Sequence, residues 1–314
     1  MSENQTIDRK IWIDGDFVPW EQATVHVLSH GVQRGSLVFD YMSVHETPRG
    51  AAIFRLFEHI ERFERSCSLV GLPLSVGREA LSEAVVETVR VNPGARAVKV
   101  SAYFPSVEVD VVPLDDRVSV AIAAYDPDAD IIARKPGRAE KRPTLRLWIE
   151  KERRNRRADI VPPQAKVAAN YSSVMTAKAR ARAAGYDEIL LIDEYGQVAE
   201  GPTTNLFMVD GAGTLCTPPD LRVLLGVTRS TVLALAKADG IPIREAPILP
   251  EELESAAEVF LTGTSAGVWP VASVDDQRIG DGQPGPISRA LAEHFERVVA
   301  GADPAFDHWL TFLD

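Results

Sequence analysis

The segment between residues 126 and 143, DPDADIIARKPGRAEKRP, constrains the fold most strongly because it divides the chain near its middle. It is rich in proline, glycine, aspartate and charge, a composition typical of the linker between two compact domains. We therefore predict a small N-terminal α/β domain of residues 1–126, a linker of residues 127–140 and a larger C-terminal α/β domain of residues 141–314.

Both halves carry mixed α/β patterns, without the regular strand–helix alternation of a nucleotide-binding Rossmann unit. In the N-terminal half we predict a hairpin at 11–20, strands at 36–45, 50–56, 95–104 and 117–125, and helices at 57–72 and 78–91. In the C-terminal half we predict strands at 144–150, 188–193, 205–210, 241–248 and 268–275, helices at 172–185, 227–240 and 287–299, and a helix running into a strand at 250–264.

Composition excludes several classes of function. The net charge of −11 argues against a nucleic-acid-binding surface. No apolar run approaches the roughly 18–20 residues of a membrane span, and the polar start MSENQTIDRK predicts no signal peptide. Cys67 and Cys216 stand far apart, so we expect two buried free thiols in a cytoplasmic protein. The six scattered histidines predict no metal site.

Lys166 is the one charged residue between Ile160 and Ala177, in a chain that is one quarter charged. A lysine in such surroundings is often a surface residue with an apolar stem. The functional alternative is a secluded amine, because apolar surroundings lower the proton affinity of a lysine. A neutral amine can form a Schiff base with an aldehyde.

Glu200 lies in VAEGPTTNLF, between apolar strand residues and a Gly-Pro break. It is either a solvated carboxylate at the end of a strand or a buried partner for a pyridinium nitrogen. In the second case its charge would keep a cofactor ring protonated and make the ring an electron sink.

Two glycine-containing turns are candidate phosphate cradles. LLGVTRSTV places Gly226, Val227 and Thr228 at the start of a predicted helix, and FLTGTSAGV places Gly263 and Thr264 after a strand. Such turns present backbone N–H groups and a hydroxyl to an anion. The alternative is ordinary helix capping, for which Thr228 is well suited.

Arg55, in IFRLFEHI, stands between apolar residues where a predicted strand meets a helix. It is either a structural ion pair or a phosphate clamp. A lysine for a Schiff base, a carboxylate for a ring nitrogen and several phosphate donors together describe a site for pyridoxal 5'-phosphate.

With these residues in place, the chain resembles the class IV aminotransferases, pyridoxal-phosphate enzymes of fold type IV. It is most similar to the branched-chain amino acid aminotransferases. The resemblance covers nearly the whole chain and is most specific in AKVAANYSS, GYDEILLIDEYGQVAEGPTTNLF, LLGVTR and EVFLTGTSAGVWPV. It implies a cofactor site between the two domains, a homodimer, and transfer of an amino group from an amino acid or amine donor to a 2-oxo acid acceptor.

The resemblance also implies a role for individual residues. Lys166 would form the internal aldimine and move the substrate's α-proton. Tyr171 would bind the cofactor's phenolic oxygen and Glu200 its ring nitrogen. The phosphate would be held by Arg55, Gly226, Val227, Thr228, Gly263 and Thr264, and a substrate carboxylate by the turn at Ser265 and Ala266.

The substrate side departs from the branched-chain pattern Tyr-Gly-x-Ser-Val-Phe-Glu-Gly-x-Arg. Gly35 and Phe39 remain, but the pattern's tyrosine, glutamate, second glycine and arginine are replaced by Arg34, Asp40, Tyr41 and Ser43. Lys99 stands where the family has a second arginine. Cofactor chemistry is therefore better supported than branched-chain specificity. Arg34 could point into the site and bind a carboxylate, or point outward.

Three alternatives stay open at this point. D-amino acid and (R)-amine transaminases share the fold and differ from branched-chain enzymes in the same segment. An aminodeoxychorismate-type lyase shares the cofactor but tends to be shorter. A binding module without activity would not need Lys166, Tyr171 and Glu200. The basic run KERRNRRAD before the lysine segment is either a solvated loop or a collar that favours acidic substrates.

Overall fold

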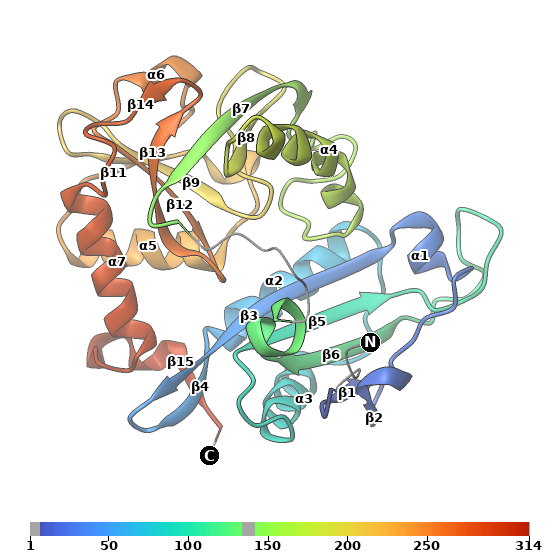
Figure 1. Cartoon of the computed structure of the whole chain (residues 1–314). Helices are drawn as coiled ribbons and strands as arrows, with labels where there is room; N and C mark the ends of the chain where they lie inside the picture. The colour runs from blue at the N-terminus through green and yellow to red at the C-terminus, as the bar shows by residue number, and fades with distance from the viewer. Residues whose placement is uncertain (1–6, 134–141, 314) are drawn as a thin grey trace. The chain divides into compact units, whose positions relative to one another are not determined.

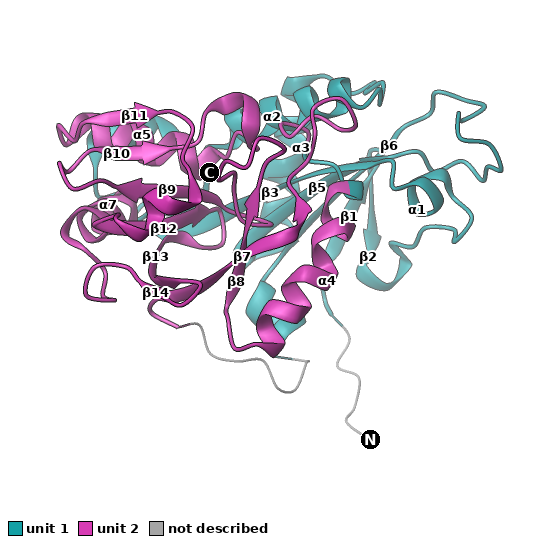
Figure 2. Cartoon of the chain, turned by 90° about the horizontal axis from the view of Figure 1, so that it is seen from above, with its two compact units in different colours: residues 1–140, 166–169, 299–314 teal, residues 141–165, 170–298 magenta. Residues whose placement is uncertain are grey.

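The chain forms two compact units, described here by a computed structural model for residues 7–133 and 142–313 (Figures 1 and 2). The first unit comprises residues 1–140, 166–169 and 299–314, and the second comprises residues 141–165 and 170–298. Each is built around its own sheet with helices, so the predicted mixed α/β class is confirmed.

The first unit contains a seven-stranded sheet in the order β15-β4-β3-β5-β6-β1-β2. Every neighbouring pair in it is antiparallel. Its strands are β1 (Lys10–Ile13), β2 (Asp16–Pro19), β3 (Leu37–Thr47), β4 (Gly50–Phe54), β5 (Ala97–Tyr103), β6 (Ser119–Tyr125) and β15 (Leu310–Phe312). Its helices are η1 (Trp20–Gln22), α1 (His30–Arg34), α2 (Leu56–Leu69), α3 (Arg78–Arg90), η2 (Pro127–Ile132) and η4 (Pro304–Trp309).

The predicted hairpin at 11–20 is confirmed, and its turn explains why it forms. Asp14 and Gly15 both have positive φ, 50° and 109°, which matches the twist of a tight two-residue hairpin turn. Helices α2 and α3 pack on each other and on the strands. Large side chains are fully buried on both helices, such as Phe63 and Leu81, and on the strands, such as Met42 and Ile122.

Two sequence-distant segments join the first unit by strand pairing. Residues 166–168 run beside β3: Phe39 N–H donates to the Lys166 carbonyl at 3.0 Å, and Ala168 N–H donates to the Leu37 carbonyl at 2.8 Å. At the other end of the chain, β15 pairs antiparallel with β4. The predicted domain boundary at residue 141 does not include these two segments in the first unit, because a local sequence pattern does not show which distant strand a segment pairs with.

The second unit contains an eight-stranded sheet in the order β11-β10-β9-β12-β13-β7-β8, with β14 beside β13. Its strands are β7 (Leu145–Arg154), β8 (Glu188–Ile192), β9 (Asn205–Val209), β10 (Leu215–Thr217), β11 (Ile243–Glu245), β12 (Glu258–Gly263), β13 (Gly267–Val274) and β14 (Gln277–Arg278). Its helices are α4 (Ala169–Ala183), η3 (Asp220–Arg222), α5 (Val227–Ala238), α6 (Pro250–Glu254) and α7 (Pro286–Val299).

The core of the second unit lies on strands that are buried along their whole length. All residues of β8, β9 and β10 are buried, as expected for apolar runs of this kind. Phe207 of β9 and Phe260 of β12 stack with ring centroids 5.2 Å apart. Helix α5 packs on β12.

The structure corrects some predicted elements. Helix α1 and strands β10 and β15 were not predicted, since each is short and carries little periodicity. The strand predicted at 241–248 shrinks to β11. Strand β7 continues through Arg154, so much of the basic run is strand rather than loop.

The linker prediction falls partly on a helix. Its first part is the short π-helix η2, where the Asp126 carboxylate accepts from the N–H groups of Asp128 and Ala129. Residues 134–140 of the predicted linker lie outside the described residues.

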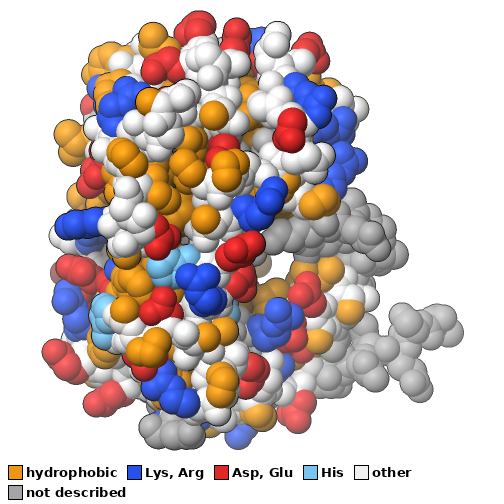
Figure 3. All heavy atoms as spheres, turned by 90° about the vertical axis from the view of Figure 1, so that its left-hand side faces the viewer, with side chains coloured by type: hydrophobic (Ala, Val, Ile, Leu, Met, Phe, Trp, Pro, Cys, Tyr) orange, Lys and Arg blue, Asp and Glu red, His pale blue; other side chains and the backbone are white. Residues whose placement is uncertain are grey.

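Both cysteines are buried and unpaired, as predicted. Among the described residues, no helix is both long enough and apolar enough to cross a membrane. On the face drawn in Figure 3, basic and acidic side chains are interspersed, without a broad area of one sign.

A pH-dependent stability follows from His45 on β3. Burial first, and the charge of Arg96 second, lower the pKa of His45 from 6.5 to about 4. As the pH is lowered from 6.5 to 4, His45 therefore binds a proton in the unfolded chain but not in the folded chain, and the free energy of unfolding decreases. Urea unfolding should show wild type losing roughly 1–3 kcal/mol more than His45→Gln between pH 6.5 and 4.5. Equal losses in the two proteins would contradict the assignment.

Candidate active site

Lys166 is buried, with 9% of its surface exposed, which confirms its expected seclusion. Its carbonyl is fixed by Phe39 on β3, and its N–H donates to Ser66 Oγ of α2 at 3.1 Å. The ammonium nitrogen lies 5.0 Å from the centre of the Phe39 ring. The first unit thus fixes the backbone of this lysine from two sides and places its side chain over an aromatic face.

Phe39 also contacts Lys99, whose Nζ lies 4.6 Å from the ring centroid. Partial burial, and then the charge of Lys166, lower the pKa of Lys99. Two ammonium groups on one ring favour an anion as their neighbour. The structure therefore brings together three of the predicted residues, Lys166, Phe39 and Lys99.

A buried charge network that the sequence analysis missed lies beside this group. The Asp40 carboxylate accepts from Arg62 at 2.8 and 2.7 Å and lies 2.7 Å from His59 Nδ1. Burial alone would raise the pKa of Asp40, but the charges and hydrogen bonds of Arg62 and His59 hold it well below its ordinary value. Burial is also the main reason that the pKa of His59 is lowered.

A sequence signal for this network existed. His59, Arg62 and Ser66 are spaced three and four residues apart, which puts them on one face of α2. That face contributes both the side-chain partners of Asp40 and the hydroxyl that accepts from the Lys166 N–H.

Arg55 precedes α2 with a left-handed backbone, φ 52°. Its guanidinium pairs with Glu58 at 2.8 Å and lies 4.6 Å from the Trp309 ring centroid. The structure therefore shows the ion pair that was one of the two readings of Arg55. Its phosphate contact stays a prediction.

Arg34 is exposed, and its guanidinium donates to the Val109 carbonyl at 2.9 Å. In the second unit, the N–H of Ala266 donates to the Gly263 carbonyl at 3.0 Å, and Ser265 is exposed. The substrate roles of Arg34, Ser265 and Ala266 stay predictions.

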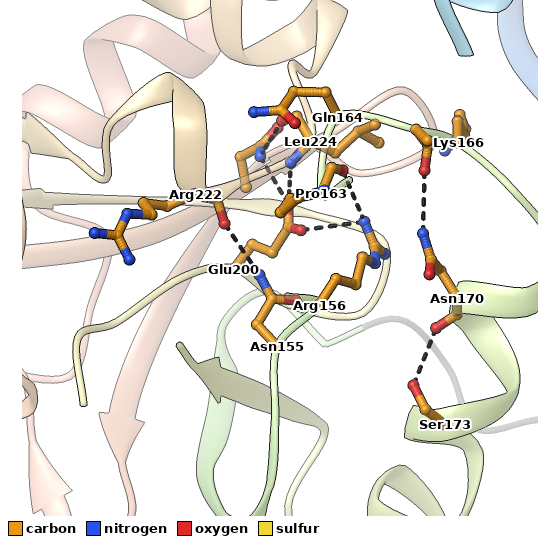
Figure 4. Close-up of polar contacts among 12 residues, drawn as sticks. Asn155, Arg156, Pro163, Gln164, Lys166, Asn170, Ser173, Glu200, Arg222 and Leu224 are labelled. Atoms are coloured by element: carbon orange, nitrogen blue, oxygen red, sulfur yellow. Dashed lines mark hydrogen bonds and ion pairs between the residues drawn. The ribbon is translucent and has the colours of Figure 1, made fainter. Parts of the chain in front are cut away.

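Glu200 is buried in the second unit, with 2% of its surface exposed, so the solvated alternative is wrong. Its Oε2 accepts from Asn205 Nδ2 at 3.2 Å and from the Leu224 N–H at 3.1 Å. Its Oε1 lies 3.3 Å from Arg156 NH1 (Figure 4). The same guanidinium lies 5.4 Å from the ring centroid of Tyr171. A fixed, buried carboxylate of this kind suits a protonated ring nitrogen.

The cradle at α5 begins with Gly226 as N-cap, so Thr228 lies inside the first turn and is not the cap. The first N–H groups of a helix have no acceptor within it and favour an anion. A Cβ on Gly226 would lie 2.0 Å from Asn205 Oδ1, so only glycine fits beside this amide.

The second cradle follows β12 at Gly263 and Thr264. A Cβ on Gly263 would lie 3.2 Å from the Thr203 carbonyl and 3.3 Å from Thr204. The hydroxyls of Thr204 and Thr262 are buried without a hydrogen-bond partner among the described residues. Unpaired buried hydroxyls beside a glycine turn fit a phosphate or another polar ligand. The residues of the second unit thus fit a phosphorylated pyridine.

Comparison with known proteins gives the family. The profile of amino-transferase class IV matches residues 37–274. The branched-chain-amino-acid aminotransferase of Pseudomonas aeruginosa is 32% identical over 98% of each chain, and that of Escherichia coli K12 is 34% identical over 96% of each. Among solved structures, the branched-chain enzyme of Thermoproteus uzoniensis with norvaline superposes with a TM-score of 0.88 at 34% identity, covering 98% of this chain and 99% of that one.

The chain therefore belongs to the class IV aminotransferase family. It is a pyridoxal-phosphate-dependent aminotransferase with the fold of the branched-chain enzymes, and the predicted fold, cofactor and reaction class are confirmed. The Thermobaculum terrenum branched-chain enzyme, solved in its pyridoxal-phosphate form, is also similar, with a TM-score of 0.88 at 29% identity over 99% of this chain and 100% of that one. The lyase, the D-amino acid and (R)-amine transaminases and the binding module are not favoured.

Gly226→Ala should disrupt the carboxylate and the α5 cradle together, because the new methyl group displaces the Asn205 amide that binds Glu200. We expect a loss of about 1–3 kcal/mol in unfolding free energy and at least roughly tenfold weaker binding of pyridoxal phosphate to the apoprotein. Urea unfolding and fluorescence titration measure the two effects. Gly211→Ala is the control, since a Cβ there meets nothing within 4 Å. Equal behaviour of both variants would refute the steric argument.

Proposed function

We propose that the enzyme transfers the amino group of a branched-chain amino acid to a 2-oxo acid, with Lys166 as the catalytic residue. The observation that carries the proposal is the buried lysine anchored on β3 and facing an aromatic ring. The names of the relatives support the donor class.

When bound, pyridoxal phosphate supplies an electron sink for the carbon that carries the amino group. Lys166 binds the cofactor's aldehyde through its amine and moves the proton at the substrate α-carbon. Glu200 keeps the ring nitrogen protonated, and Tyr171 binds the phenolic oxygen. The phosphate would be held by Arg55, Gly226, Val227, Thr228, Gly263 and Thr264.

On the substrate side, Phe39 offers an apolar wall for a branched side chain, and Lys99 offers a cation for a carboxylate. A carboxylate-bearing acceptor is supported by a similar branched-chain enzyme that has been solved with N-(5'-phosphopyridoxyl)-L-glutamate. We assign Arg34 and the turn at Ser265 and Ala266 to carboxylate binding as well. Two buried, unpaired cysteines support a reducing, cytoplasmic location.

Lys166→Ala tests the assignment. The variant should still bind pyridoxal phosphate through the phosphate contacts, but it should lose turnover by about 10²–10⁴-fold from proton transfer alone. Borohydride reduction followed by peptide mass spectrometry should find the cofactor on Lys166 in wild type and on no lysine in the variant. Lys237→Ala, at an exposed position of α5, serves as the control. Retained turnover in Lys166→Ala would overturn the proposal.

We also propose that the protein is a homodimer, and that a second copy of the chain covers a valine-rich surface of the first unit. This surface consists of Val25, Val27, Leu28, Val32, Val107, Val109, Val111, Val112 and Leu114, all exposed. Its two segments are joined through a bridge between Ser29 and Val107. Exposed apolar side chains in such a continuous group indicate a protein interface.

Light scattering after gel filtration tests the dimer. Wild type should have about twice the mass of one chain, and Val109→Asp with Leu114→Asp should shift it toward one, because buried unpaired carboxylates oppose association. Both side chains are exposed in the single chain, at 94% and 89%, so folding is not affected. Leu221→Asp, on the second unit and 77% exposed, is the control. A wild-type monomer, or a double variant with the wild-type mass, would exclude this interface.

A further inference from the structure

Arg156 differs from the other cations of the basic run. Within residues 151–157, all of which the structure describes, Lys151, Arg153, Arg154 and Arg157 are exposed. The Arg156 side chain is only 8% exposed, and the carboxylate that it approaches is 3% exposed. The sequence analysis treated the whole run as a loop or an entrance collar, and this one residue turns inward instead.

Arg156 contacts two of the residues that we propose bind the cofactor. NH1 lies 3.3 Å from both Glu200 Oε1 and the Pro163 carbonyl (Figure 4). The guanidinium carbon lies over the Tyr171 ring, 5.4 Å from its centroid. Glu200 and Tyr171 are the residues assigned to the ring nitrogen and the phenolic oxygen. A single buried cation therefore adjoins both.

Arg156 is not needed to hold the Glu200 carboxylate in place. Glu200 Oε2 is already held by two neutral donors, Asn205 Nδ2 and the Leu224 N–H. Burial of a guanidinium carries a desolvation penalty, and a buried ion pair is weak evidence for added stability. What Arg156 adds to this carboxylate, beyond the hydrogen bonds that fix it, is positive charge.

We propose that Arg156 tunes the cofactor's ring nitrogen by sharing the charge of Glu200. A carboxylate that already faces one cation attracts a second less strongly, because the two cations repel each other. The ring nitrogen then holds its proton less tightly than it would beside Glu200 alone. Arg156 is a positioning residue, because it affects the ring nitrogen only through the charge of Glu200. The inference rests on the proposed role of Glu200.

The test compares two ligands on the apoprotein by fluorescence titration. One is pyridoxal phosphate, and the other is its carbocyclic analogue, in which the ring nitrogen is replaced by C–H. The ratio of their affinities isolates the nitrogen. Arg156→Gln removes the charge but keeps neutral donors, and it should raise the preference for pyridoxal phosphate by about tenfold. Arg156→Lys keeps the charge and should leave the ratio near the wild-type value.

Arg157→Met is the matched control, because Arg157 is exposed and pairs with Asp159 and Glu194. It should leave the ratio unchanged. A merely structural role for Arg156 would weaken both ligands equally, so an unchanged ratio in Arg156→Gln would overturn the inference, as would a lowered one. Arg156→Met provides a second neutral variant if the glutamine variant fails to fold.

The Glu200→Gln background tests whether Arg156 acts through the carboxylate. With no charge to share and no proton held on the ring nitrogen, Arg156→Gln should no longer change the ratio. A persisting effect would show direct action on the ligand and overturn the inference. Failure of wild type to bind either ligand would instead overturn the proposed function, so the two failures are distinguishable.

Discussion

The pairing of residues 166–168 with β3 is the constraint on which the lysine side of the structure depends. Two backbone hydrogen bonds, from Phe39 to Lys166 and from Ala168 to Leu37, bring a segment from the middle of the chain into the first unit. Because β3 also carries Phe39 and Asp40, one strand sets the backbone of the lysine, the ring beneath its ammonium group and the carboxylate of the neighbouring charge network. The backbone of Lys166 is therefore fixed by hydrogen bonding to a strand of the sheet.

One buried carboxylate in each unit, Asp40 in the first and Glu200 in the second, has both a cationic partner and further donors. Asp40 has Arg62 and His59, and Glu200 has Arg156, Asn205 and the Leu224 N–H. Their surroundings differ in one respect. The side-chain partners of Asp40 come from a single face of α2, whereas the partners of Glu200 named here come from three separate segments. The first arrangement is built into one helix and the second depends on the whole second unit.

Several residues of the candidate site could be predicted from the sequence, and the features that could not be predicted have identifiable physical reasons. Lys166 and Glu200 stand out because a charge in an apolar run is locally visible, and the glycines of both cradles mark turns. Arg156 could not be found in this way, since it lies among exposed arginines of the same type and only its tertiary contacts separate it from Arg157. Propensity made Thr228 a suitable N-cap for α5 as the alternative to a phosphate cradle, but the N-cap is Gly226, where close packing against Asn205 leaves no room for a Cβ. Residues 166–169 fall in the first unit through strand pairing at long range, which no local pattern encodes.

That pairing also has a consequence for the order of folding. The pairing of residues 166–168 with β3 closes a loop of more than a hundred residues. Such non-local contacts form slowly, because the chain loses the entropy of loop closure before the contacts can stabilise it. During synthesis, β3 and its neighbours can assemble while the lysine is still to be made. Lys166 can therefore pair with β3 only after most strands of the first unit have been made, so its backbone has no ordered position until translation has passed the middle of the protein.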